Sequence, residues 1–425
     1  MRSGSVPFRE QAMKRRWVRG SLQLLIVTVL VLLTVEVGFR GYLALRIGPS
    51  ILFYGTSFGR TADGSAEHST LLRSIYHRRM RGTGEEFHNI RQHEQRAENY
   101  SKYRPHQIRY TYDAITGEVY EASINGRGFR GSDFADQKLP GVVRVVALGA
   151  SSTFGYHNRD DLTYPAQLER MLDERCPKQD FEVINLGIPH LLSDEIVALF
   201  LAEGLPLSPD VVTFYEGFND SGSGATKTRQ HAAERSALKR LHRWTRERFV
   251  IVAFVDSLVS ERTKRFSSQQ LEAHMAGKAA HFIANLDLLA DAAEEVGAKL
   301  LVARQQARSL LVLREDLPGV RFHDEIDLVR EKLAHEGWLS RDERNFLTYE
   351  LLLDALEPWA SERGVTVVDT LGALDPHREE IVSWVHLSHE GNRIIADTLA
   401  SAILELKCPP PTSTASPPAH TPLER

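Results

Sequence analysis

The sequence has only two cysteines and little net charge, and both features argue against classes of function. The cysteines of this 425-residue chain, Cys176 and Cys408, do not form a CxxC pair, which argues against a zinc site or a dithiol redox motif. One disulfide between them is possible, and nothing in the sequence indicates it. The formal net charge of -4 gives no basic footprint for nucleic acid.

Composition places the bulk of the chain among soluble globular proteins. Hydrophobic residues make up 42% and charged residues 25% of the sequence. The length suits one large catalytic domain with appendages, or two ordinary domains.

An uncharged apolar run near the N-terminus predicts a membrane anchor. Residues 21–35, SLQLLIVTVLVLLTV, and their apolar flanks approach the roughly 20 residues that a membrane-spanning helix needs. Basic residues are concentrated before the run, so residues 1–20 are expected in the cytoplasm and the rest outside. We therefore expect a single transmembrane helix over 21–42, with the part of the chain that follows it in a periplasm-like space. A cleaved signal peptide is the alternative, but no small-residue cleavage site follows the run.

Residues 43–140 are polar and predict a stalk or a small β-containing subdomain. They include two strand-like pieces, QIRYTYD and EVYEASIN. The segment 126–131, GRGFRG, is formally a GxGxxG motif. A dinucleotide site also needs a strand before the motif and a helix opening on it, so we interpret this segment as a glycine-rich loop.

Strand and helix patterns alternate over residues 141–407. Five apolar, β-branched runs of the kind found in buried parallel strands occur at 142–148, 181–186, 210–216, 298–303 and 365–369. Helices are expected at 165–175, from 194 with Ser193 as N-cap, and at 282–297, 351–364 and 390–406. This alternation predicts an α/β fold with a doubly wound parallel sheet of about five strands and helices on both faces.

Two further segments depart from the alternating pattern. Residues 221–281 are basic and helical in composition and predict a helical insertion that packs on the core. The tail 408–425 is rich in proline, serine and threonine, which predicts disorder.

Four segments with chemically useful residues follow the predicted strands. LGASSTFG follows the first strand, NLGIPH the second and EGFND the third, while SWVHLSHEGN stands after the last. In open α/β sheets, ligands gather outside the carboxyl ends of the strands. We therefore expect these four segments to form one site.

In order, spacing and strand context, the four segments resemble the sequence blocks of the SGNH (GDSL-type) hydrolase superfamily over residues 142–405. The resemblance implies a flavodoxin-like three-layer α/β/α fold and a serine hydrolase that needs no metal or cofactor. It makes Ser151 the nucleophile and His386 the base. The implied oxyanion hole consists of the backbone N–H groups of Ser151 and Gly187 and the side-chain amide of Asn219. INGRGFRG and the N-terminal apolar run also resemble those of membrane-tethered members.

The nucleophile segment differs from the family pattern in one position. Ala150 stands where the family usually has an aspartate, which changes local hydrogen bonding more than mechanism. Ser152 is a second hydroxyl beside Ser151, and the alignment of GASST with the family's first block selects Ser151. His389 lies three residues after His386, so the two could form a His-x-x-His metal-binding pair. We give this interpretation little weight because no third ligand is evident.

The last segment departs from the family at a position that matters for catalysis. The family has an aspartate three residues before the catalytic histidine, to orient the ring and stabilise the imidazolium; here that position is Ser383. Three nearby carboxylates could replace it: Asp375, Glu379 and Glu380. Alternatively, a carbonyl group or Ser383 itself orients His386.

These features predict an extracytoplasmic serine esterase that acts on an acyl or acetyl ester, or an acylated glycan, through an acyl-enzyme. One alternative is an O-acyltransferase that passes the acyl group to cell-envelope or exported polysaccharide. The other, motivated by Ser383, is a non-catalytic envelope protein that binds glycan on the same fold.

Overall fold

The computed structural model of the protein describes most of the chain from residue 119 to 408 and selected parts before it. The described residues are 8–47, 95–96, 101–103, 105–106, 108–113, 119–222, 245, 249, 251–252 and 265–408. The chain divides into two compact units, Met1–His88 with Arg229–Lys264, and Asn89–Thr228 with Arg265–Arg425. The expected tail from residue 409, and much of the predicted 43–140 subdomain and 221–281 insertion, lie outside the described residues.

The first unit contains the long helix α1, Phe8–Ile47, which includes the predicted segment 21–42. Within α1, Glu36 pairs with Arg40 at 2.7 Å and accepts a hydrogen bond from the Ile251 backbone N–H at 2.9 Å. The part of the chain that the structure describes holds no helix that is both long and apolar enough to cross a membrane. The predicted transmembrane helix is therefore not supported.

Two small antiparallel pairs precede the main sheet in the second unit. Strands β1 and β2 are Gln95–Arg96 and Ser101–Lys102, and β3 and β4 are Ile108–Tyr112 and Val119–Ser123. The GRGFRG loop follows β4 and leads into β5 without opening a helix, so it lacks the context of a dinucleotide site.

The centre of the second unit is a parallel sheet of five strands, in the order β6-β5-β7-β8-β9. The strands are β5 Val142–Gly149, β6 Asp180–Asn185, β7 Val211–Tyr215, β8 Lys299–Ala303 and β9 Thr366–Val368. Along β5, Val146 and Leu148 face one hydrophobic cluster while Val145 and Ala147 face another. Both faces of the strand are buried, which explains its continuous apolar sequence. The predicted α/β fold is confirmed.

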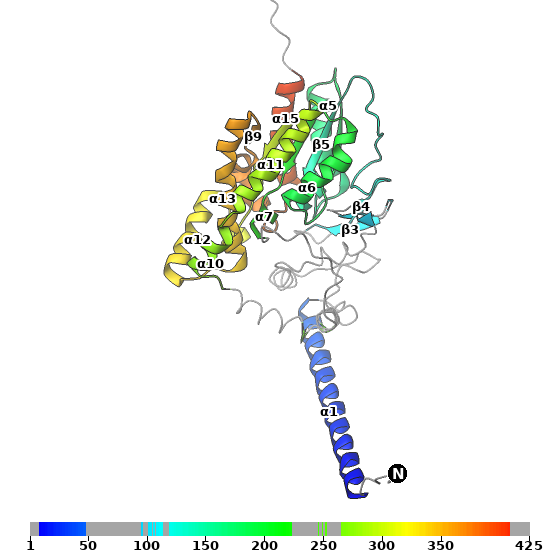
Figure 1. The fold of residues 1–425 in the computed structure, drawn as a ribbon. Helices are drawn as coiled ribbons and strands as arrows, with labels where there is room; N and C mark the ends of the chain where they lie inside the picture. The colour runs from blue at the N-terminus through cyan, green and yellow to red at the C-terminus, as the bar shows by residue number, and fades with distance from the viewer. Residues whose placement is uncertain are drawn as a thin grey trace, which may run out of the picture. The chain divides into compact units, whose positions relative to one another are not determined.

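Helices cover both faces of this sheet (Figure 1). Residues of α5 and α15 lie in one cluster, and residues of α6, α11, α12 and α13 in the other. The helices of the second unit are α4 Ser151–Phe154, α5 Tyr164–Arg175, α6 Ser193–Leu199, α7 Phe218–Gly222, α10 Ser268–Met275, α11 Lys278–Glu295, α12 Phe322–Glu336, α13 Arg341–Arg363, α14 Thr370–Leu374 and α15 His389–Lys407.

The structure corrects two details of the helix predictions. The N-cap of α6 is Leu192, whereas Ser193 is the first helical residue and its hydroxyl donates to Asp220 Oδ1 at 2.6 Å. Helix α13 begins at Arg341, ten residues before the predicted start, because Ser340 forms a capping box with Glu343.

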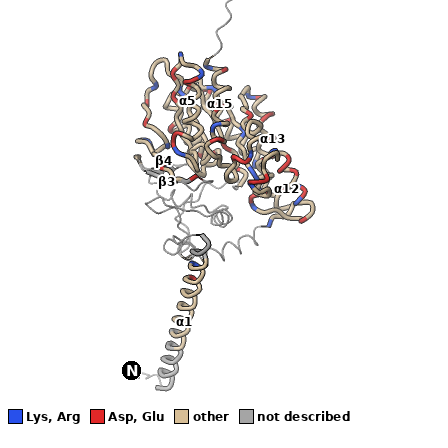
Figure 2. Tube along the Cα trace, turned by 180° about the vertical axis from the view of Figure 1, so that it is seen from behind, with Lys and Arg blue, Asp and Glu red and all other residues tan. Residues whose placement is uncertain are grey.

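The second unit carries charges of both signs along its helices and a disulfide at its C-terminal end. Acidic and basic residues are interspersed along α5, α12, α13 and α15 (Figure 2). Cys176, at the end of α5, forms a disulfide with Cys408, at the end of α15. The sequence left this pairing open.

Candidate active site

The turn between β5 and α4 places Ser151, which is largely buried, at the carboxyl edge of the sheet. A Cβ atom on Gly149 would lie 2.1 Å from Thr153 Oγ1 and 2.6 Å from the Tyr215 carbonyl oxygen, so only glycine fits here. The chain can then turn directly from the strand into α4, whose first residue is Ser151. As a first-turn residue, Ser151 has a backbone N–H without a partner inside the helix.

His386 lies within hydrogen-bond distance of this serine. Its Nε2 atom is 2.8 Å from Ser151 Oγ, although the two residues are far apart in the chain. His386 is 2% exposed, and the rings of Tyr156, His157 and Trp384 surround its imidazole at centroid distances of 5.4, 5.3 and 5.6 Å. This geometry suits transfer of the serine proton to Nε2.

Ser383 occupies the third position of this arrangement. Its Oγ lies 2.9 Å from His386 Nδ1 and accepts a hydrogen bond from the His386 backbone N–H at 3.2 Å. A hydroxyl that accepts the Nδ1 proton leaves Nε2 unprotonated and facing Ser151. Ser383 can therefore select the tautomer that a base requires, but it supplies no negative charge.

Of the three carboxylates considered as alternatives, Asp375 and Glu380 bond to other segments, while Glu379 Oε2 is buried with no hydrogen-bond partner among the described residues. Asp375 Oδ1 accepts from the Phe322 backbone N–H at 2.9 Å and from Gln306 Nε2 at 3.0 Å. Glu380 Oε2 accepts from the hydroxyl of Ser388. In the described part of the chain, no hydrogen bond or ion pair joins Asp375, Glu379 or Glu380 to His386.

Asn219 and Gly187 are the other expected oxyanion donors. They differ in whether an N–H hydrogen remains for a ligand. Asn219 Nδ2 donates one hydrogen to the Leu191 carbonyl at 3.0 Å, which leaves its second hydrogen for a ligand. The Gly187 N–H instead donates to Asn185 Oδ1 at 2.9 Å. In this structure the Asn219 amide therefore keeps one hydrogen for a ligand, whereas the Gly187 N–H is engaged by Asn185.

Asn185 is a residue that the sequence reasoning missed. Besides accepting from Gly187, it donates through Nδ2 to the Thr153 carbonyl at 2.9 Å and so joins the loop after β6 to α4. A Cβ on Gly187 would lie 2.3 Å from the Phe154 nitrogen. The glycine at this position thus permits close packing against the nucleophile helix. A polar residue at the end of a buried strand was the available signal.

Glu216 is a second missed residue, at the end of β7 beside the Asn219 loop. Its Oε1 accepts from the backbone N–H groups of Gly217 and Asn219, each at 3.0 Å. Burial raises the pKa of this carboxyl to about 7, and hydrogen bonds from Asn219, Gly217 and Ala150 oppose the shift. Glu216 therefore gains or loses its proton near neutral pH while holding the loop that carries Asn219.

The INGRGFRG segment has a structural role next to the site. The Arg130 guanidinium donates to the carbonyls of Phe154 at 3.0 Å, Gly155 at 2.6 Å and Asn158 at 2.6 Å. Asn158 Nδ2 in turn donates to the Leu387 carbonyl at 2.9 Å, next to His386. This motif therefore supports the chain that follows the nucleophile helix.

Ser152 and His389 do not share the position of Ser151 and His386. The Ser152 hydroxyl bonds to Gln305 and to the Val385 carbonyl, and the His389 carbonyl accepts from Gln167 at 3.1 Å. Among the described residues, no group of three or more potential metal ligands comes together.

A comparison with protein families decides where this arrangement belongs. The model of the GDSL-like lipase/acylhydrolase family matches residues 147–394, more than half of the chain. The chain belongs to this family. Ser151, Gly187, Asn219, Ser383 and His386 all fall inside the matched GDSL-like region.

Solved structures also resemble this GDSL-like protein at low sequence identity. A lipase/acylhydrolase from Enterococcus faecalis is 16% identical, with 62% of this chain and 96% of that chain covered and a TM-score of 0.37. An acetyl xylan esterase, AlAXEase, is 15% identical (61% and 100% covered, TM-score 0.36), and a putative arylesterase from Agrobacterium tumefaciens str. C58 is 16% identical (62% and 99% covered, TM-score 0.36). No curated protein matches the chain.

Proposed function

We propose that this GDSL-family protein cleaves a carboxylic ester, an acyl or acetyl ester, through an acyl-enzyme on Ser151. The observation that carries the proposal is the 2.8 Å contact between Ser151 Oγ and His386 Nε2. A serine hydroxyl is a weak nucleophile until a positioned base takes its proton, and this contact provides that base.

The geometry supports a two-stage reaction. Ser151 Oγ attacks the ester carbonyl carbon while its proton passes to His386 Nε2. The carbonyl oxygen becomes negative and accepts hydrogen bonds from the Ser151 N–H and the Asn219 amide. The bond to the leaving oxygen then breaks, and His386 returns the proton to the departing alcohol. Water, deprotonated by the same histidine, attacks the acyl carbon. The bond to Ser151 Oγ then breaks, His386 returns the proton to Ser151 and the acid is released.

Labelling with a fluorophosphonate probe tests this proposal on the purified full-length chain. We expect the wild-type protein to be labelled and Ser151→Ala to lose the label, because the probe reacts with an activated serine. Ser401→Ala is the matched control, since the Ser401 hydroxyl is exposed and bonds only within α15 to the Asp397 carbonyl. Equal labelling of wild type and folded Ser151→Ala would refute the proposed nucleophile.

The same protein distinguishes the two alternative functions. Turnover of p-nitrophenyl acetate that is slow in water and accelerated by added oligosaccharide would favour an O-acyltransferase that acts on envelope or exported polysaccharide. Oligosaccharide binding without any labelling would favour a non-catalytic glycan-binding protein. The contact between Ser151 and His386 favours the two catalytic functions over the non-catalytic one, because a base already lies beside the serine.

We further propose that the catalytic domain works in an oxidising, extracytoplasmic compartment. The support is the disulfide between Cys176 and Cys408, since structural disulfides persist mainly outside the reducing cytoplasm. A membrane-anchored arrangement through the N-terminal helix stays a prediction from the sequence.

Thiol alkylation of the protein trapped directly from cells tests this location. We expect no alkylation of Cys176 or Cys408 before reduction and alkylation of both after it. The Cys408→Ser variant, which leaves Cys176 unpaired, serves as the positive control. If both wild-type thiols react without a reductant, the proposed compartment is wrong.

A further inference from the structure

Gln305 is a buried amide that bonds to two of the loops around Ser151. It lies just beyond the end of β8 and is 1% exposed. Its Nε2 donates to Ser152 Oγ at 3.0 Å, and its Oε1 accepts from the Phe218 backbone N–H at 3.1 Å. One side chain therefore connects the nucleophile turn to the loop that carries Asn219.

Ser152 extends this connection to the third loop. Its hydroxyl accepts from Gln305 and donates to the Val385 carbonyl at 3.2 Å. Ser152 is 5% exposed and Val385 is 2% exposed, so bulk water does not compete for these bonds. The chain of bonds runs from Phe218 through Gln305 and Ser152 to Val385.

Each contact lies one residue from a proposed functional group. Ser152 follows Ser151, Phe218 precedes Asn219, and Val385 precedes His386. The network therefore constrains the backbone on which the nucleophile, the oxyanion donor and the base stand.

The chemistry of both side chains suits this arrangement. An amide can donate to one partner and accept from another, and a hydroxyl can do the same. An ionised glutamate could still accept from Phe218 but could not donate to Ser152, and leucine could do neither. Gln305 itself is held by the Tyr349 hydroxyl, which donates to its backbone carbonyl at 2.6 Å.

We propose that Gln305 and Ser152 are positioning residues that set the spacing of Ser151, Asn219 and His386 for catalysis. This inference rests on the proposed function of the same site. A displacement of about 1 Å can cost roughly 10²-fold in rate, so loss of the network lowers kcat without removing a reacting group.

Kinetics of the full-length variants Gln305→Glu, Gln305→Leu, Ser152→Ala and the double variant Gln305→Leu/Ser152→Ala test the proposal. With p-nitrophenyl acetate, we expect each single change to lower kcat about 10- to 100-fold, with KM within about 2-fold of wild type. The double variant should fall no further than the worse single variant, because both changes interrupt one chain of bonds. Gln305→Glu keeps the acceptor for Phe218, so it provides a conservatively changed protein if Gln305→Leu fails to fold.

Gln306→Leu is the matched control for a buried glutamine in the same loop. Gln306 is also fully buried, but it bonds to the Leu371 carbonyl, to Asp375 and to Arg378 instead of the catalytic loops. We expect this variant to lose stability in urea while the folded fraction keeps a kcat near that of wild type.

Two outcomes would overturn the positioning role. One is an unchanged kcat and an unchanged rate of fluorophosphonate labelling in folded Gln305→Glu and Ser152→Ala. The other is a double variant whose loss equals the product of the single losses, which would mean independent effects. Failure of the proposed function would look different, because wild-type Ser151 itself would then take no label.

Discussion

Ser383→Asp is expected to raise kcat/KM for ester hydrolysis roughly 10- to 100-fold at neutral and alkaline pH. In a triad with a carboxylate, replacing it with an amide costs about 10⁴ in rate, partly through the wrong histidine tautomer. Ser383 already lies 2.9 Å from His386 Nδ1 and can hold the correct tautomer, so the contribution that a serine at this position cannot make is the negative charge of a carboxylate. A carboxylate beside an imidazolium stabilises the charged form and raises the pKa of the ring by one unit or more. Each unit corresponds to about a tenfold change in the protonation equilibrium.

The pH–rate profile gives this prediction a second readout. Because the new carboxylate stabilises the imidazolium, the acidic limb of the profile should move to higher pH in Ser383→Asp. The unprotonated imidazole of His386 is the active form, so the gain in kcat/KM should vanish at acidic pH. Ser383→Asn, which has a similar shape and no charge, is the matched control. Equal rates for folded Ser383→Asp and Ser383→Asn would show that a negative charge at position 383 does not increase the rate.

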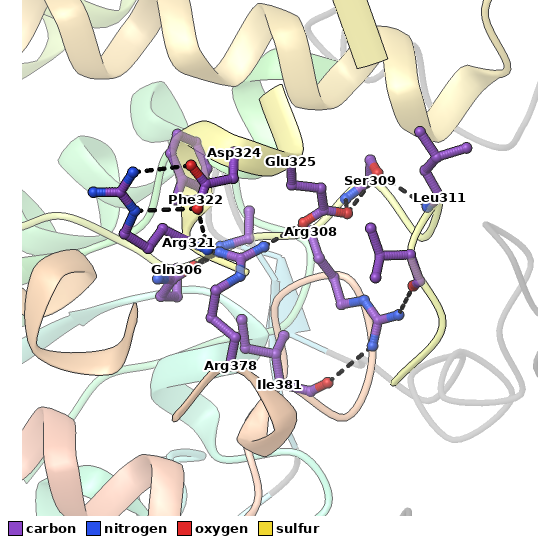
Figure 3. Close-up of polar contacts among 12 residues, drawn as sticks. Gln306, Arg308, Ser309, Leu311, Arg321, Phe322, Asp324, Glu325, Arg378 and Ile381 are labelled. Atoms are coloured by element: carbon purple, nitrogen blue, oxygen red, sulfur yellow. Dashed lines mark hydrogen bonds and ion pairs between the residues drawn. The ribbon is translucent and has the colours of Figure 1, made fainter. Parts of the chain in front are cut away.

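Breaking the buried ion pair between Arg378 and Glu325 is expected to cost about 3–5 kcal/mol of unfolding free energy. Both side chains are 0% exposed, and the Arg378 guanidinium contacts the Glu325 carboxylate directly (Figure 3). Arg378 also donates to Gln306 Oε1 at 2.7 Å, and Glu325 Oε1 accepts from the Ser309 hydroxyl at 2.6 Å. Removing Arg378 leaves the Glu325 carboxylate buried without its counter-ion, and removing Glu325 leaves Arg378 with only Asp375, 3.8 Å away.

Urea unfolding of Glu325→Gln, Arg378→Met and the double variant Glu325→Leu/Arg378→Met measures this cost. Arg378→Met should lose the stated stability because the Glu325 charge stays buried without a partner, and Glu325→Gln should lose less because Asp375 remains near Arg378. The double variant should recover most of it, since an apolar pair of similar volume strands no charge. Exposed pairs are typically worth 1 kcal/mol or less, so Arg393→Gln, which breaks the surface pair with Glu390, should change stability little. Single losses as small as that of Arg393→Gln would contradict the prediction.

The strands of the sheet could be predicted because a strand that is buried on both faces has a continuous apolar sequence. The runs at 142–148 and 298–303 coincide with β5 and β8 to within one residue at each end. Helix boundaries were less predictable. The start of α13 depends on a capping box at Ser340, and Ser193, predicted as a cap, bonds across space to Asp220 instead.

In the candidate site, too, the residues that belong to sequence motifs could be predicted, and those that act through contacts between distant segments could not. Ser151 and His386 followed from the order of the four segments. The partner of His386 did not, because Asp375 and Glu380 also lie near it in sequence but bond to Phe322 and Ser388. Gln305 gave no motif, since its role depends on side-chain contacts with segments distant in the chain.

The cross-link between Cys176 and Cys408 closes a covalent ring that contains β6, β7, β8, β9 and His386. Strand β5 and Ser151 lie outside it, on the open N-terminal arm. The proposed nucleophile therefore connects to the ring through the chain segment that ends at Cys176, and the pairing of β5 with β6 and β7 holds it beside the base. Withdrawal of this one central strand would separate serine from histidine while the ring stayed closed.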